Sequence, residues 1–78
     1  MTPVLAAYIK AEFRGQPATF LQSVEDRLMA DDRSRWKGRV LVLDYACDTG
    51  EVTVGDTYAE AVEETLPWEE FRAYAARC

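Results

Sequence analysis

The chain has 78 residues, of which 49% are hydrophobic and 12% aromatic, and it carries a formal net charge of −5. This length supports a single domain over residues 1–78 with one core, and it leaves little room for the deep cleft of an enzyme. The negative charge disfavours nucleic acid as a partner, and no apolar run approaches the roughly 18 residues that a membrane span needs.

Residues 3–14 are predicted to form the first helix. Pro3 after a threonine is typical of a helix start, and Gly15 is typical of a helix end. A strand is the competing interpretation, because residues 9–14 alternate between apolar and polar side chains. In the helix, one apolar stripe would consist of Leu5, Ile9 and Phe13.

A second helix is predicted over residues 20–30. Thr19 and Gln22 have the spacing of a capping box, and apolar residues recur after them at helical intervals. The apolar positions are Leu21, Val24 and Leu28.

A basic run follows, with a positive charge at every second position. In an extended segment these side chains would project from one side of the chain and Trp36 from the other, whereas a helix would scatter them. One interpretation is a strip that grips phosphates or carboxylates. The other is that the run pairs with the acidic C-terminal half, or that Trp36 covers the core while its charged neighbours remain in water. The basic residues are Arg33, Arg35, Lys37 and Arg39.

Residues 39–47 and 51–54 have the composition of a β-hairpin joined by a turn at 48–50. The first arm is apolar on both faces over residues 40–43, which is typical of a strand that lies centrally or packs against another chain. Because an isolated hairpin is marginal in water, a third strand is expected. Residues 6–14 or a second copy of the protein could supply it.

Two helices are predicted after the hairpin. Thr57 and Glu60 again have capping-box spacing, and Pro67 would interrupt this helix and begin the last one. The inward residues of the first would be Tyr58, Ala61 and Val62, and those of the second Trp68, Phe71 and Ala75.

These elements predict an α+β fold in the order α-α-β-β-α, with a central β-hairpin. If residues 3–14 form a strand instead, the order becomes β-α-β-β-α with a three-stranded antiparallel sheet.

The triplet Asp48-Thr49-Gly50 resembles the active-site triplet of the aspartic proteases, in which two aspartates share a proton. The chain departs from that family, because Ala46 and Cys47 stand where the family has two bulky apolar residues and because helices dominate. We interpret the triplet as a hairpin turn, in which aspartate accepts a backbone N–H and glycine adopts a positive φ.

No histidine is present, so Ser23, Ser34 and Cys47 have no imidazole base and the usual catalytic triad cannot be assembled. Cys47 and Cys78 lack the spacing of a zinc or redox site. Since no basic leader precedes an apolar run, we expect a cytoplasmic protein with free thiols, of which Cys47 is buried in a strand.

Three carboxylates near the end of the hairpin, Asp44, Asp48 and Glu51, are candidates for a divalent cation site. Their intervals of four and three positions do not require them to converge, so we interpret them as a solvated edge that discourages aggregation. The sequence therefore predicts no enzymatic activity, no cofactor and no metal site.

The C-terminal half is strongly acidic. Nine carboxylates and no Lys or Arg occur between Val40 and Phe71, and such a run attracts basic partners. We predict a protein that binds and blocks a basic partner, as a DNA mimic or an anti-CRISPR-type inhibitor of a nucleic-acid-processing or prokaryotic defence complex would. The residues predicted to bind the partner are Asp44, Asp48, Glu51, Glu60, Glu63, Glu64, Glu69 and Glu70, with Trp68 as an exposed aromatic anchor.

Two other functions are compatible with the same sequence. A homo-oligomeric accessory or regulatory subunit would use residues 40–43 and a Trp68/Phe71 face as its interface. The second of these functions is weak binding of nucleic acid, although the net charge opposes it. The residues that would bind it are Arg33, Arg35, Lys37 and Arg39.

Overall fold

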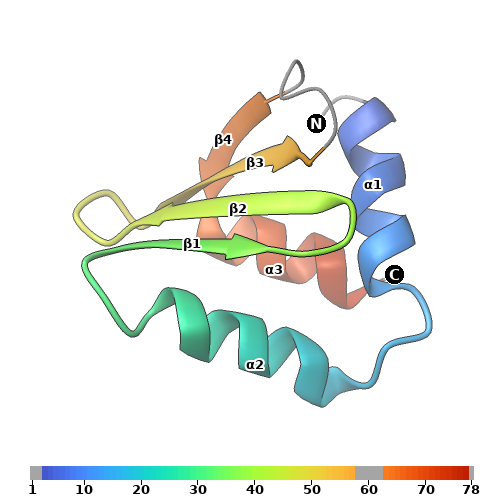
Figure 1. Ribbon diagram of the computed structural model, residues 1–78, viewed down its shortest axis with the longest axis horizontal. Helices are drawn as coiled ribbons and strands as arrows, with labels where there is room; N and C mark the ends of the chain where they lie inside the picture. The colour runs from blue at the N-terminus through green and yellow to red at the C-terminus, as the bar shows by residue number, and fades with distance from the viewer. Residues whose placement is uncertain (1–2, 58–62, 78) are drawn as a thin grey trace.

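Three helices and a four-stranded antiparallel sheet follow one another in the order α-α-β-β-β-β-α (Figure 1). The computed structural model describes residues 3–57 and 63–77. The predicted α+β class is confirmed, and the strand-first alternative is wrong because the first element is a helix. The elements are α1 (Pro3–Phe13), α2 (Ala18–Leu28), β1 (Arg33–Lys37), β2 (Leu41–Ala46), β3 (Glu51–Asp56), β4 (Glu63–Pro67) and α3 (Trp68–Ala76).

Helix α1 begins with a proline and ends before a glycine, as its sequence predicts. Gly15 has a φ of 77°, a left-handed conformation that glycine adopts without strain, so the chain can turn there toward α2. The predicted apolar stripe is buried and consists of Leu5, Ile9 and Phe13.

Helix α2 begins two residues before the predicted start. Pro17 precedes it with φ −68° and ψ 158°, and no side chain caps the helix, so the predicted capping box of Thr19 and Gln22 is wrong. Proline fixes the φ of the residue before the first turn, which sets the start of the helix without a hydroxyl cap. The predicted inward face is buried and consists of Leu21, Val24 and Leu28.

The sheet is a simple meander, in which each strand pairs antiparallel with the next in the order β1-β2-β3-β4. The predicted hairpin is confirmed as β2 and β3, and β2 lies between two neighbours, as its apolar residues predict. The further strands come from residues 33–37 and 63–67, so the expectation that residues 6–14 supply the third strand is wrong, and the sheet does not need a second copy to provide one.

Residues 63–67 were expected in a helix and instead form β4. Leu66 pairs with Val52 and is only 6% exposed, so strand pairing and burial determine the structure of these residues. The predicted inward residues Tyr58, Ala61 and Val62 lie outside the described residues. Helix α3 follows β4 directly, and its predicted inward face of Trp68, Phe71 and Ala75 is buried.

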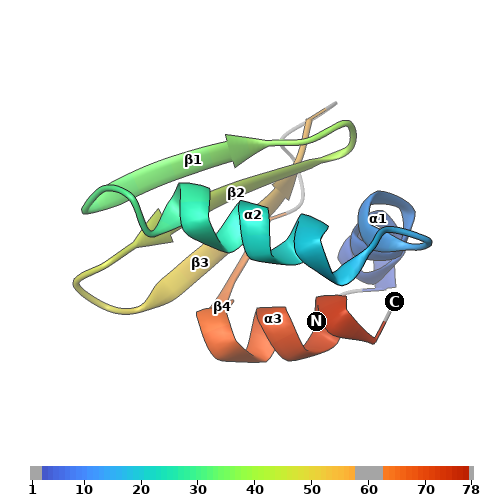
Figure 2. The same ribbon diagram turned by 90° about the horizontal axis from the view of Figure 1, so that it is seen from below.

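Among the elements that the structure describes, the helices pack against one face of the sheet and none covers the other, as Figure 2 shows. Strand residues alternate between these faces, so the inner face is mostly apolar and the opposite one carries mostly charged, polar or small residues. The inner face of the sheet contributes Leu41, Leu43, Val52, Val54 and Leu66 to the core.

Cys47 is exposed in the turn between β2 and β3, so the prediction that it is buried in a strand is wrong. The strand ends one residue earlier, at Ala46, and the turn carries the thiol out of the sheet. Cys78 lies outside the described residues. Among the helices of the described ranges, none has the length and apolar character needed to cross a membrane.

Candidate functional site

Strand β1 presents its basic side chains on the sheet face that the helices leave uncovered, which we call the open face. Arg33, Arg35 and Lys37 are exposed there, while Trp36 is half-buried and packs against the core on the other face. The prediction for an extended basic segment is therefore confirmed over these three residues. Arg39 lies beyond the strand, in the turn between β1 and β2.

Arg35 and Asp44 form a cross-strand ion pair on the open face. The Arg35 Nε donates to Asp44 Oδ1 at 2.8 Å, and a second guanidinium nitrogen lies 3.3 Å from Oδ2. The two residues are direct partners in the register of β1 and β2. One carboxylate that was predicted to bind a partner is thus already neutralised within the chain.

Several other carboxylates gather at one end of the molecule, which we call the acidic end. The topology brings them together, because β1 starts, β2 turns into β3, and β4 passes into α3 at this same end (Figure 1). The backbone N–H of Cys47 donates to Asp32 O, and that of Trp68 donates to Gly50 O at 3.0 Å. The acidic end consists of Asp31, Asp32, Asp48, Glu51, Glu69 and Glu70.

Its side chains are available to solvent. All of them are exposed except Glu51, which is half-buried, and none forms an ion pair with another described residue. Glu69 and Glu70 also occupy the first turn of α3, where the helix dipole favours negative charge. The fold therefore concentrates anionic charge here, and Arg27 and Arg33, which line a hollow beside Asp31, offset only part of it.

The remaining acidic residues of the predicted site lie elsewhere. Glu63 is exposed at the start of β4, at the opposite end of the sheet from the acidic end, and Glu64 is half-buried on the inner face. Glu60 lies outside the described residues. Of the described carboxylates predicted to bind a partner, the structure thus brings together Asp48, Glu51, Glu69 and Glu70 and separates Asp44, Glu63 and Glu64 from them.

Trp68 is 4% exposed, so the expectation that it is an exposed aromatic anchor is wrong. It packs edge-on against Tyr45, with ring centroids 6.3 Å apart, and lies beside Phe71 in the core. Phe71 is fully buried, so these two residues do not form an interface with another copy either. The helical spacing of the two residues identified a core face, and spacing alone does not say what covers such a face.

The triplet Asp48-Thr49-Gly50 is a hairpin turn. Asp48 Oδ1 accepts the backbone N–H of Thr49 at 3.1 Å, and Gly50 has a φ of 69°. Asp44, which pairs with Arg35, does not join this turn. Over the described ranges, no group of three or more acidic or cysteine side chains is placed to hold a metal ion.

Glu12 is a buried carboxylate that the sequence analysis does not single out. Its Oε1 accepts the backbone N–H groups of Val40 at 2.9 Å and Leu41 at 3.2 Å, so a side chain from α1 fixes the turn between β1 and β2. Gly38 lies against it, and a Cβ at this position would collide with the Glu12 carboxylate and the Trp36 ring. The carboxylate thus has a structural role, and only the folded arrangement could show it.

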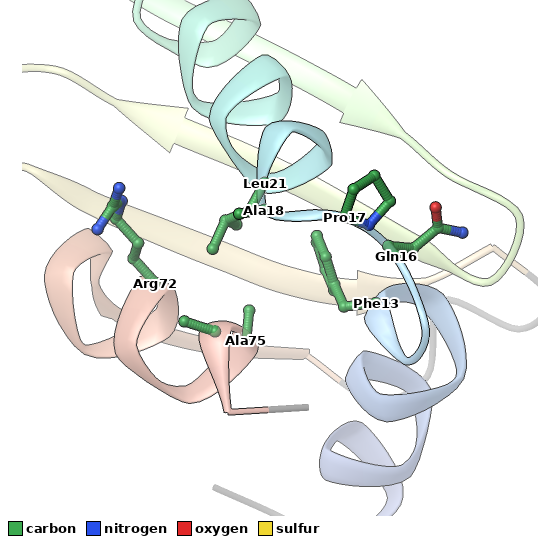
Figure 3. Close-up of a pocket in the computed structure, with 8 residues that line it drawn as sticks. Phe13, Gln16, Pro17, Ala18, Leu21, Arg72 and Ala75 are labelled. Carbon is green, nitrogen blue, oxygen red and sulfur yellow. The ribbon is translucent and has the colours of Figure 1, made fainter.

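A small pocket of about 240 Å³ opens where the helices converge (Figure 3). The Phe13 ring and short aliphatic side chains line it, while the guanidinium of Arg72 is held at its edge by Glu25, at 2.7 Å. Such a lining can accept an apolar group and offers no nucleophile with a base. The lining residues are Phe13, Gln16, Pro17, Ala18, Leu21, Arg72, Ala75 and Ala76.

No protein-family model matches this chain, and no curated protein or solved structure shows significant similarity to it. The function of the chain is therefore inferred from its own geometry.

Proposed function

We propose that this protein is a non-enzymatic binding protein that docks its acidic end on a basic surface of another protein and blocks it. The observation that carries the proposal is the gathering of carboxylates from separate segments of the chain at one end, with no ion pair to another described residue. Like charges that are held close repel one another, and a cationic partner relieves that repulsion. The site is thus suited to a basic partner.

The partner class that fits best is a nucleic-acid-processing or prokaryotic defence protein with a cationic groove. Such a groove binds phosphates mainly through charge, so an array of exposed carboxylates can compete for it. Long-range attraction would also speed the encounter, in a manner that salt suppresses. In this proposal Asp48, Glu69 and Glu70 make the central contact, and Asp31, Asp32 and Glu51 extend it.

Two variants of equal net charge test the proposal. Glu69→Gln combined with Glu70→Gln removes two charges from the acidic end, and Ala7→Lys combined with Ala11→Lys adds two positive charges on exposed positions of α1. Each pair changes the net charge from −5 to −3. Tethered proteins would be used to capture partners from a bacterial lysate at low and at high salt.

We expect the wild type and the α1 variant to retain a basic protein that duplex DNA displaces, and the α3 variant to lose at least about tenfold in affinity. Equal loss in both variants would show that only net charge matters. Retention that duplex DNA does not reduce would remove the nucleic-acid-mimicking form of the proposal.

A further inference from the structure

The open face carries balanced charges on a molecule that is otherwise acidic. Its basic residues all lie on β1, and its acidic residues lie on β2, β3 and β4. Between them the floor is made of small or uncharged side chains, including Ala46, Thr53, Gly55 and Thr65. The charged residues are Arg33, Arg35 and Lys37 on one side and Asp44, Glu51 and Glu63 on the other.

The strand register arranges these residues in rows across the sheet. One row contains Lys37 at the β1 edge and Glu63 at the β4 edge, with Val42 and Gly55 between them. The row at the opposite end of the strands has Arg33 on β1 and Glu51 on β3, the strand next to β4. The middle row holds the Arg35–Asp44 pair. Positive charge thus lies at one edge of the face, and unpaired negative charge lies toward the other.

We propose that a second copy of this chain packs on the open face, about a two-fold axis that runs parallel to the strands between β2 and β3. This axis places β1 of one copy over β4 of the other. Lys37 then faces Glu63 of the second copy, and Arg33 lies beside its Glu51, with each contact made twice. A two-fold interface must be self-complementary in this way.

The same charges exclude the other simple arrangement. An axis perpendicular to the strands would place β1 over β1, so that Arg33 of each copy would face Lys37 of the other, and like charges in contact are unfavourable. Because the chain carries −5 overall, two copies repel through most of their surface, whereas the described residues of the open face carry as many positive as negative charges. The face that the helices leave uncovered is therefore the one that best tolerates a second copy.

The size of the open face limits the expected affinity of the dimer. Four strands about 4.8 Å apart and five or six residues long make a face of roughly 15 by 17 Å. This footprint is small compared with the roughly 800 Å² that each partner buries in a standard interface. A weak, reversible dimer at micromolar or higher concentration is therefore expected.

A charge swap tests the proposal. Sedimentation velocity from about 10 µM to 1 mM would be measured for the wild type, Lys37→Glu, Glu63→Lys and the double variant. Each single reversal sets like charges against each other twice and should weaken the dimer at least about tenfold. The double variant restores opposite charges at the same places and should return to within about threefold of the wild type.

A cross-link gives a second test that needs no substitution. A carbodiimide joins a lysine to a carboxylate only at ion-pair distance, so a mixture of labelled and unlabelled protein should yield a Lys37–Glu63 link between copies. A wild type that stays monomeric at 1 mM would overturn the proposal, as would a dimer that survives both single reversals or a double variant no stronger than the singles. None of these changes touches Asp48, Glu69 or Glu70, so failure here leaves the proposed function intact.

Discussion

The two faces of the sheet differ in burial and in the kind of side chain they carry. On the inner face, Leu43 and Val54 pair across the central strands and are fully buried against the helices. On the open face one position away, Asp44 and Thr53 pair in the next row and remain partly in water. Because successive side chains of a strand point to opposite faces of the sheet, adjacent residues lie in different environments. The inner face supplies stability, and the open face tolerates charged side chains because it is not part of the core.

Neighbouring truncations on β2 would sharpen this contrast most. Leu43→Ala removes a fully buried side chain and leaves a cavity, so we expect the free energy of unfolding to fall by about 3 kcal/mol. Val42→Ala, on the open face, should cost less than about 1 kcal/mol in dilute solution. Urea denaturation of both variants measures the difference. Equal losses would show that the open face is also packed in solution.

Glu12 is a charged residue on the helix side of the sheet, and replacing it should change the stability by an amount between those of the largest and smallest effects considered. Glu12→Ala leaves the buried N–H of Leu41 and the half-buried N–H of Val40 without an acceptor, so we expect a loss of about 2–3 kcal/mol in unfolding free energy. Glu12→Gln keeps an acceptor oxygen and should lose about 1 kcal/mol.

Arg39→Ala is the matched control for the charge of Glu12. The Arg39 Nε lies 3.7 Å from Glu12 Oε2, and the arginine side chain is 75% exposed, so this variant should stay within about 0.5 kcal/mol of the wild type. Thermal denaturation of the three variants ranks them. A loss from Arg39→Ala equal to that from Glu12→Ala would show that the ion pair, and not the turn, is what Glu12 stabilises.

The contrast between buried and exposed faces also explains which elements the sequence could predict. Apolar periodicity identified α1, α2 and α3 and the inward face of each, because burial requires apolar residues at helical spacing. Turn chemistry at 48–50 identified the hairpin. These signals are local, so they are readable without knowing what lies across the sheet.

The parts that were missed depend on long-range pairing. Strand β4 is defined by its partner Val52 and not by its own sequence, which carries two glutamates and a proline. Asp31 and Asp32 precede the basic run in the sequence, and they join the acidic end only through the pairing of β1 with β2, so no local pattern connects them with the other carboxylates. The hydrogen bonds of Glu12 span 28 and 29 positions and have no sequence signal.

The smallest expected effect concerns the ion pair on the open face. Arg35 and Asp44 are hydrogen-bonded, but their side chains are 65% and 46% exposed, so solvent and salt screen most of their attraction. A double-mutant cycle with Arg35→Ala and Asp44→Ala should give a coupling energy of about 0.2–1 kcal/mol at low salt, and less at 1 M salt. A coupling above about 2 kcal/mol that salt leaves unchanged would mean that the pair is shielded from water. Such a coupling energy in dilute protein would contradict an open face that is exposed to water. A coupling energy that rises only with protein concentration would instead show that a second copy covers the Arg35–Asp44 pair.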